Sequence, residues 1–406
     1  MTSIRESVDA LVIGAGPAGA ASAALLARAG FDVLVADRAE FPREKACSEY
    51  LSPEAVRVLD RLGVVGALEQ AGARPLEGTI VHGPGGSRLH GLFGEARPAP
   101  FRPTGLSVAR RVLDLELVRA ALGSGAGVLE RTRFEDLVYD GGAVAGAVLR
   151  GPRGRCVIRS RLVIGADGLR SGVAARLGAR SRGRLRRVAF VAHVAGVPGL
   201  ARSAEMHVGA RGYVGLNPIG DDVANVAVVV PASSATGARG RAAEFFFETL
   251  ERFPGVRGRV DRRRVVRPVL ATGPFAARSR RVTANGALLV GDAADFFDPF
   301  TGEGICAALR GAELVAAHAG AALAERGAPT DRQLAGYRRA RIRAFAGKWA
   351  VERLIGYGML WPRAFDHAVG CIGRRPGMAH TLIGVTGDFV PARAALNPLF
   401  LARLLF

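Results

Sequence analysis

The sequence predicts an α/β fold, in which a parallel sheet covered by helices is joined to a mostly antiparallel sheet and followed by C-terminal helices. Residues 9–38 pass from an apolar strand-like run through a small-residue helix to a second apolar run. Strand-like runs split by glycine occur at residues 78–92 and 188–230, and residues 288–292 again resemble a buried parallel strand. The parallel sheet is therefore expected to be assembled from separate parts of the chain.

The first βαβ unit carries a glycine motif at its turn. Gly14, Gly16 and Gly19 form the pattern GxGxxG directly between the first strand-like run and the helix. The first glycine permits a tight turn, the second lets a pyrophosphate approach the backbone, and the third lets the helix pack close to the strand. Asp37 ends the second run, where a carboxylate can accept hydrogen bonds from ribose hydroxyls. The unit predicts a Rossmann-type dinucleotide site.

The remaining helices are predicted from their end signals. Residues 52–63 read SPEAVRVLDRLG, with a serine cap, a proline at the first helical position and a glycine stop. A second amphipathic helix is expected at about residues 110–122, and residues 334–406 read mainly as helices broken by proline and glycine.

Composition and charge narrow the class of protein. The formal net charge is +20, but Lys45 and Lys348 are the only lysines, and the arginines are spread along the whole chain without an aromatic-interleaved basic motif. We therefore expect no nucleic-acid partner. The four cysteines are far apart, with no CxxC pair and no secretory signal, which predicts a cytoplasmic protein without a metal site.

Two further segments resemble those of a known superfamily. LVIGADGLRSGVAARLG (residues 162–178) and GALLVGDAADFFDPFTGEGICAALRGAELVAA (residues 286–317) resemble the second and third fingerprints of FAD-dependent enzymes with the p-hydroxybenzoate hydroxylase fold. The resemblance implies that Asp167 supports the cofactor region, that Asp292 binds the ribityl or ribose part of FAD, and that Arg110 contacts FAD. The helix that follows Pro299 would direct its positive end at the flavin N1–C2 edge.

Within this superfamily, FPREKACSEYLSPEAVRVLDRLG and DPFTGEGICAALRGAEL are most similar to the geranylgeranyl-reductase branch. By that resemblance the backbone at Cys47 and Ser48 runs along the flavin. The full set of residues expected to bind FAD is Gly14, Gly16, Ala18, Gly19, Asp37, Arg38, Cys47, Ser48, Arg110, Asp167, Asp292, Pro299, Gly302, Gly304 and Ile305.

A length of 406 residues exceeds one compact core, and the change between parallel-type and antiparallel-type strand patterns indicates where the domains divide. The expected division is a discontinuous FAD-binding domain of residues 1–77, 105–178 and 280–330, a substrate-binding sheet domain of residues 78–104 and 179–279, and a C-terminal helical region of residues 331–406.

The sequence is compatible with two reaction classes. The branch usually has glycine where this chain has Ser48 and Tyr50, and an aromatic Tyr-x-Trp-x-Phe-Pro-like strand where this chain has YVGLNP (residues 213–218). These departures favour an oxygen-dependent monooxygenase that hydroxylates a hydrophobic or phenolic, polyketide- or lipid-like compound. The alternative is a flavin-dependent reductase of carbon–carbon double bonds in a prenyl or quinone chain. In both, NAD(P)H is expected to bind transiently, because the chain has no second GxGxxG motif.

No general base is evident, so the catalytic residues are not assigned, and Cys47, Pro299 and Tyr213 are weak candidates. We interpret Cys47 as a small side chain in the wall of the flavin site rather than as a reactive thiol, with a redox pair between Cys47 and Cys306 as a minor alternative. The expected partner is an apolar small molecule. The C-terminal PLFLARLLF is expected to cover the protein's own core, with peripheral association at a membrane surface as the alternative.

Overall fold

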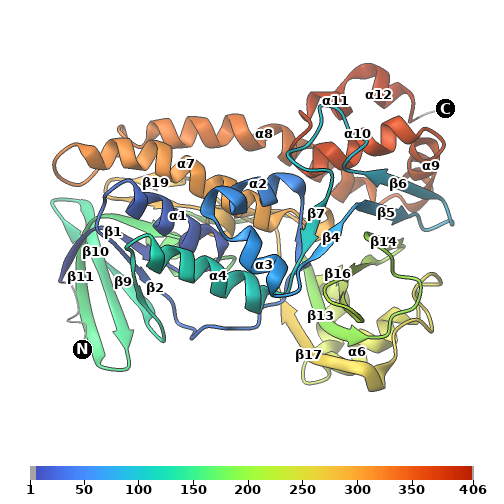
Figure 1. The fold of residues 1–406 in the computed structure, drawn as a ribbon, viewed down its shortest axis with the longest axis horizontal. Helices are drawn as coiled ribbons and strands as arrows, with labels where there is room; N and C mark the ends of the chain where they lie inside the picture. The colour runs from blue at the N-terminus through green and yellow to red at the C-terminus, as the bar shows by residue number, and fades with distance from the viewer. Residues whose placement is uncertain (1–5, 405–406) are drawn as a thin grey trace.

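The computed structural model describes residues 6–404, so residues 1–5 of the predicted first domain and residues 405–406 of the predicted C-terminal region lie outside it. The two largest sheets have eight and seven strands. Figure 1 shows an elongated molecule with one of these sheets toward each end. The α/β fold class predicted from the sequence is confirmed.

The eight-stranded sheet is built on the predicted βαβ unit. β1 (Ser7–Ile13) lies between β2 (Val33–Ala36) and β11 (Gly154–Gly165), and all three run parallel. At the two ends of the parallel part, β8 (Gly127–Leu129) pairs with β2, and β20 (Ala287–Leu289) pairs with β11. The apolar run near residue 288 therefore does return to the parallel sheet. The antiparallel strands attached to it are β9 (Arg133–Asp140), β10 (Ala143–Gly151) and β19 (Thr283–Ala284).

Helices cover one face of this sheet. α1 (Pro17–Arg28) packs with α4 (Arg110–Gly123) and α7 (Gly304–Ala324) over a shared apolar core. α1 is mostly alanine and glycine, which lets its two neighbouring helices approach closely. The other face of the parallel strands packs against apolar residues of β9, β10 and the short α5 (Gly172–Arg176).

The helix predicted at residues 52–63 is present as α2 (Pro53–Leu62), which begins after Ser52 and ends at Gly63 in the left-handed conformation (φ 79°). It is followed by α3 (Val65–Gln70). A small sheet beside these helices joins β3 (Tyr50–Leu51), β7 (Gly105–Ser107) and β4 (Arg74–Leu76).

The seven-stranded sheet is antiparallel except for one pair. Its strand order is β17 (Val265–Thr272), β13 (Arg187–Ala195), β16 (Val223–Pro231), β15 (Gly212–Pro218), β14 (Ser203–Gly209), β5 (Gly78–His82) and β6 (Arg88–Leu92). Only β14 and β5 run parallel within it, among residues 6–404. One face packs against α6 (Ala242–Leu250), so the opposite face is free to form the wall of a cavity.

The predicted division into domains stays a prediction. A second small sheet joins β12 (Arg180–Arg182), β18 (Ala277–Ser279) and β21 (Asp295–Phe296), and it therefore pairs strands from both sides of the boundary predicted between residues 279 and 280.

The C-terminal part is helical, as predicted. α8 (Ala335–Gly358) lies along α7, and α9 (Pro362–Gly373) and α10 (Pro376–Thr386) cover β6 (Figure 1). They are followed by the short α11 (Arg393–Leu396) and α12 (Pro398–Ala402). In α12, Phe400 is buried, whereas Leu399 and Leu401 are exposed. Of the helices in the described part of the chain, none combines the length and the apolar character that a membrane span requires.

Candidate functional site

A cavity of about 750 Å³ lies between the carboxyl ends of the parallel strands and the inner face of the seven-stranded sheet. Ligands of open α/β sheets bind outside the carboxyl ends of the strands. Every residue predicted to bind FAD lines this cavity except Gly19, and the catalytic candidate Tyr213 lines it too. The structure thus brings together residues from three widely separated parts of the chain.

The three glycines of the turn have different surroundings. A Cβ atom on Gly14 (φ 102°) would lie 2.5 Å from the carbonyl oxygen of Ala166, and one on Gly19 would lie 1.8 Å from the carbonyl oxygen of Gly14. Gly16 faces the cavity, where a Cβ would meet only the side chains of Arg43 and Arg110, at 3.5 and 4.0 Å. Gly14 and Gly19 therefore permit close packing, and Gly16 leaves the backbone open to a ligand.

Asp37 is held in place at the end of β2. Its Oδ2 accepts a hydrogen bond from the N–H of Ala15 (2.7 Å), and its Oδ1 accepts one from the N–H of Ala39 (2.8 Å). Asp37 lines the cavity next to Arg38. Since each carboxylate oxygen can accept more than one hydrogen bond, Asp37 retains capacity for ribose hydroxyls.

Cationic side chains gather opposite the glycine turn. Arg110 donates two hydrogen bonds to Asp114 (2.8 and 2.9 Å), and Arg43 forms an ion pair with the same carboxylate (3.2 Å). Burial alone would lower the pKa of Arg110, but Asp114 and Cys47 together raise it. Lys45 points into the same space, where desolvation and the nearby Arg110 lower its pKa. Three cations around an open glycine turn suit the pyrophosphate of a dinucleotide.

The two aspartates of the later fingerprints also line the cavity. Asp167 Oδ2 accepts a hydrogen bond from the N–H of Gly172 (2.6 Å), whereas its buried Oδ1 has no partner within residues 6–404. Burial raises the pKa of Asp167. Burial also raises the pKa of Asp292, against the opposing effect of Lys45 and Arg110. An open glycine turn, cations and an unpaired acceptor together fit a dinucleotide cofactor.

A buried polar network fixes the wall segment Cys47–Ser48–Glu49, and sequence reasoning missed it. Glu49 is fully buried with φ 58°, and its carboxylate accepts hydrogen bonds from the Arg110 N–H (2.9 Å) and the His193 Nε2–H (2.7 Å). Asn217 Nδ2 donates to the carbonyls of Ser48 and Glu49 (both 3.0 Å). Asn225 Nδ2 donates to the Cys47 carbonyl (2.6 Å).

The sequence held one signal of this network. Asn217 and Asn225 face each other across β15 and β16, and asparagine is uncommon in a strand unless its side chain has a specific partner. Because these two amides anchor the carbonyls of the wall segment, the seven-stranded sheet positions the loop that borders the cavity.

The cysteines are free thiols. Cys47 is half-buried and lines the cavity, whereas Cys306 is buried in α7 and does not line it. Burial, followed by the nearby Glu303, raises the pKa of the Cys306 thiol well above its usual value. Cys47 thus belongs to the cavity wall, whereas its place along the flavin and its lack of thiol reactivity stay predictions.

Tyr213 takes part in a second buried network beside Pro299. Its hydroxyl donates to Asp298 Oδ1 (2.7 Å), and Arg187 donates to Asp298 Oδ2 (2.6 Å). Burial and then the Asp298 carboxylate raise the pKa of Tyr213 well above its usual value. The residue before Pro299 thus connects the turn to the sheet, and sequence reasoning missed both Asp298 and Arg187.

The sheet side of the cavity is apolar. Its wall consists largely of small aliphatic side chains with a few larger apolar ones, namely Ala189, Val191, Ala204, Met206, Ala227, Val229, Leu270 and Phe275. Phe296 and Phe300 complete it from the turn before α7. This part of the cavity suits an apolar ligand.

Glu303, at the start of α7, predicts a pH dependence of stability. Burial raises the pKa of its carboxyl group to about 7, against the effect of Lys348 and the Ser52 hydroxyl. The folded state thus favours the protonated form, so this contribution to stability is present below pH 4.5 and is lost as pH rises through 7. Ionisation of Glu303 should therefore lower the free energy of unfolding by about 3 kcal/mol between pH 4.5 and 8.

Glu303→Gln should remove that loss, and urea unfolding of the wild type and the variant across this pH range measures it. The variant should lose less stability than the wild type as pH rises. Equal pH profiles for the two proteins would contradict a protonated Glu303 in the folded state.

Comparisons with known proteins agree with this site. A family model described as "FAD binding domain" matches residues 7–350. Menaquinone reductase of Mycolicibacterium smegmatis is 32% identical over 320 residues, which is 74% of each chain. Digeranylgeranylglycerophospholipid reductase of Methanosarcina mazei is 28% identical over 322 residues, 77% of this chain and 74% of that protein.

The solved structures include a geranylgeranyl bacteriochlorophyll reductase-like protein from Thermoplasma acidophilum. It superposes with a TM-score of 0.80 at 21% identity, over 99% of each chain. At that identity the likeness concerns the fold.

Proposed function

Because this chain belongs to the FAD binding domain family, in the geranylgeranyl-reductase-like branch of the p-hydroxybenzoate hydroxylase-fold superfamily, we propose that it reduces a carbon–carbon double bond in an apolar prenyl or quinone substrate. It is a FAD-dependent oxidoreductase. The monooxygenase reaction that the sequence favoured is kept as the second candidate.

FAD, when bound and reduced, supplies the hydride for such a reaction, and in our proposal NAD(P)H is the reductant that reduces the flavin. In our proposal, the backbone at Gly16 and the guanidinium groups of Arg43 and Arg110 hold the pyrophosphate. Asp37 binds the ribose, and the backbone of Cys47 and Ser48 lies along the flavin.

The observation that supports reduction is the chemistry of the sheet wall. Among the cavity-lining residues of the segment 187–275, Tyr213 is the one ionisable side chain, and its hydroxyl donates to Asp298. Hydroxylation of a phenol is faster when a base removes the phenolic proton. An apolar wall offers no such base, but it can exclude water and hold a prenyl chain or a quinone ring against the cofactor. The two relatives named above are also reductases by their names, one of menaquinone and one of a digeranylgeranylglycerophospholipid.

One observation favours the second candidate. Gly215 and Asn217 occupy positions where the branch usually has aromatic residues. Gly215 lines the cavity, whereas the side chain of Asn217 binds the backbone of the wall segment. The absence of an indole at position 215 leaves room for a fused-ring compound rather than a slender chain. Such a ligand would suit an oxygen-dependent hydroxylase of phenolic or polyketide-like substrates.

A single-turnover experiment distinguishes the two reactions. The FAD-loaded protein is reduced, freed of excess reductant, and mixed without oxygen with a menaquinone that carries a short prenyl chain. Reduction predicts that the flavin is reoxidised by the substrate, and that the product gains two hydrogens in a side-chain double bond. A parallel arm repeats the reaction under ¹⁸O₂, with free reduced FAD as the control for uncatalysed chemistry.

The mass and fragmentation of the product decide the outcome. Saturation of a prenyl double bond without ¹⁸O supports the proposal. Incorporation of one ¹⁸O atom, with no reoxidation by the substrate when oxygen is absent, would reject it in favour of the monooxygenase.

A further inference from the structure

Two histidines and a glutamate gather on the face of the seven-stranded sheet that is turned away from the cavity. His82 ends β5, and Glu205 and His207 lie two positions apart on the neighbouring parallel strand β14, where His207 is directly opposite His82. Met206, between the two β14 residues, lines the cavity, so the side chains of its neighbours point to the opposite face. The cluster is thus separate from the proposed FAD site.

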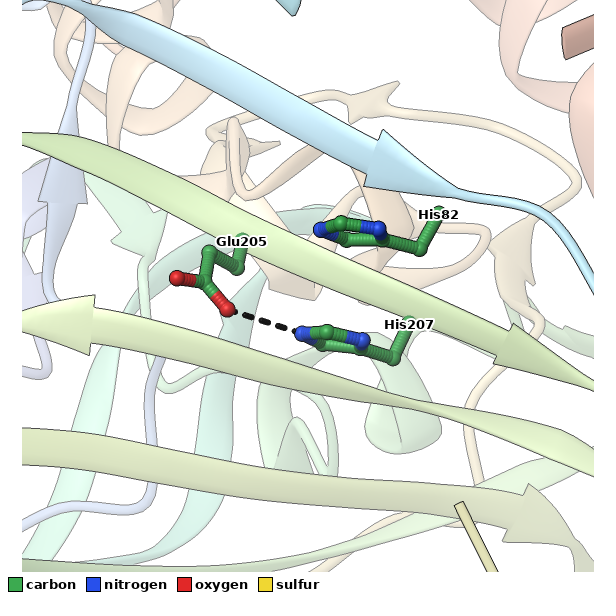
Figure 2. Close-up of side chains that lie close together, drawn as sticks. All are labelled: His82, Glu205 and His207. Carbon is green, nitrogen blue, oxygen red and sulfur yellow. Dashed lines mark hydrogen bonds and ion pairs between the residues drawn. The ribbon is translucent and has the colours of Figure 1, made fainter. Parts of the chain in front are cut away.

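The three side chains present their ligating atoms to one another. The imidazole rings stack with centroids 4.4 Å apart and an interplanar angle of 5°. One ligating atom from each residue lies within 4.8 Å of the other two, and His207 Nε2 is 2.8 Å from Glu205 Oε2. Figure 2 shows one nitrogen of each ring turned toward the Glu205 carboxylate. With bonds of about 2.0–2.2 Å, one cation can lie between all three once the two imidazole rings turn out of their parallel stack, because a bound metal lies in the plane of each ring.

The cluster is mostly buried, and neighbouring residues pack against it. Glu205 and His207 are buried, while His82 is half-buried and leaves a path to solvent. A Cβ on Gly255 would lie 2.6 Å from His207 Nδ1, so the glycine makes room for this ring. Arg259 donates from Nη1 to Glu205 Oε2 (2.6 Å) and from Nη2 to Oε1 (3.1 Å).

We propose that His82, Glu205 and His207 form a binding site for a divalent transition-metal ion of the zinc type. Two imidazoles and one carboxylate are a donor set that suits Zn²⁺, whereas Ca²⁺ and Mg²⁺ prefer oxygen ligands throughout. Arg259 orients the carboxylate, as outer-shell partners of metal ligands do, and it binds Glu205 Oε2, the same oxygen that is 2.8 Å from His207 Nε2.

Because the site lies on the face of the sheet turned away from the cavity, the ion would have a structural rather than a catalytic role. The ion would link β5 to β14, and this pair joins the β5–β6 hairpin to the other strands of the seven-stranded sheet. Because the cavity wall includes Thr79 of β5 and Ala204 and Met206 of β14, the ion would hold two strands of that wall in register. An ion that binds only the folded chain raises its thermal stability.

The test uses the full FAD-loaded chain, expressed without a histidine tag and dialysed against a chelator. Zn²⁺ is titrated in competition with a chromophoric chelator, and Co²⁺ absorption reports the ligand set. The wild type is expected to bind about one equivalent and to gain thermal stability with added Zn²⁺. His82→Gln and His207→Gln should each weaken binding by more than about tenfold, because each removes a direct ligand.

His90→Gln is the matched control, since His90 lies on the adjacent strand β6 with Ser203 as its partner and should leave Zn²⁺ affinity unchanged. His82 is half-buried, so its variant tests the proposal even if His207→Gln does not fold, and the bound flavin spectrum reports that each protein is intact. Equal Zn²⁺ affinity for the wild type and His82→Gln would overturn the proposal and leave the cluster as an ion pair of Glu205 with Arg259.

Discussion

Replacing Gly19 with alanine is expected to lower the free energy of unfolding by about 3 kcal/mol or more and to abolish FAD retention. The added Cβ would lie 1.8 Å from the carbonyl oxygen of Gly14 and 3.1 Å from the Cβ of Ala166. The backbone cannot yield as a flexible side chain can, so α1 must move away from the turn that borders the cavity. Urea unfolding and the flavin absorbance that remains after gel filtration measure the two effects.

Gly66→Ala is the matched control for that variant. Gly66 lies in the helix α3, and a Cβ there meets nothing within 4 Å. The control should leave stability unchanged or raise it by up to about 1 kcal/mol, since alanine favours the helix over glycine. If Gly19→Ala behaved like Gly66→Ala, the close packing of α1 against the glycine turn would not be needed for the site.

Replacing Arg110 with leucine should both destabilise the fold and weaken FAD binding. Asp114 is fully buried and would keep Arg43, at 3.2 Å, as its remaining ion-pair partner within residues 6–404. Removal of one member of a buried ion pair costs about 3–5 kcal/mol. The variant also loses a guanidinium group at the glycine turn, which should weaken FAD binding by about 10- to 100-fold. Urea unfolding and titration of the apoprotein with FAD measure the two losses.

A double variant separates the structural part of this effect from the binding part. Arg110→Leu combined with Asp114→Leu removes both buried charges, so stability should return to within about 1 kcal/mol of the wild type. FAD affinity should stay low, because the cation is still absent. Recovery of FAD affinity together with stability would mean that Arg110 acts only as the partner of Asp114.

The parts of the site that could be predicted from the sequence are those whose chemistry lies in a short segment. Gly14, Gly16 and Asp37 belong to one βαβ unit, in which the order of strand, turn and helix already determines the neighbours of each residue. The segments around Asp167 and Asp292 could be predicted in the same way, because each is a short stretch that resembles a fingerprint of the superfamily. Their residues line one cavity, as expected, although Gly19 packs behind the turn instead of facing it.

The residues that were missed owe their roles to partners far away in the chain. Glu49 contacts His193, and the carbonyl of Cys47 contacts Asn225, so a loop near the start of the chain meets two strands of the seven-stranded sheet. A single-sequence pattern carries no information about such pairs, because each residue on its own resembles an ordinary loop or strand residue. The same holds for Asp298, which sequence reasoning passed over beside Pro299 and which binds Tyr213.

The sequence by itself thus determined the fold class, the FAD cofactor and most of the cavity lining, because glycine spacing, helix signals and strand periodicity act over short distances. Only the tertiary structure decided which wall residues are held by buried polar networks, and that His82 faces Glu205 and His207 across the parallel pair β5 and β14. More than a hundred residues separate these partners in the chain. Strand pairing, which depends on burial of the whole sheet, brings their side chains to within a few ångströms.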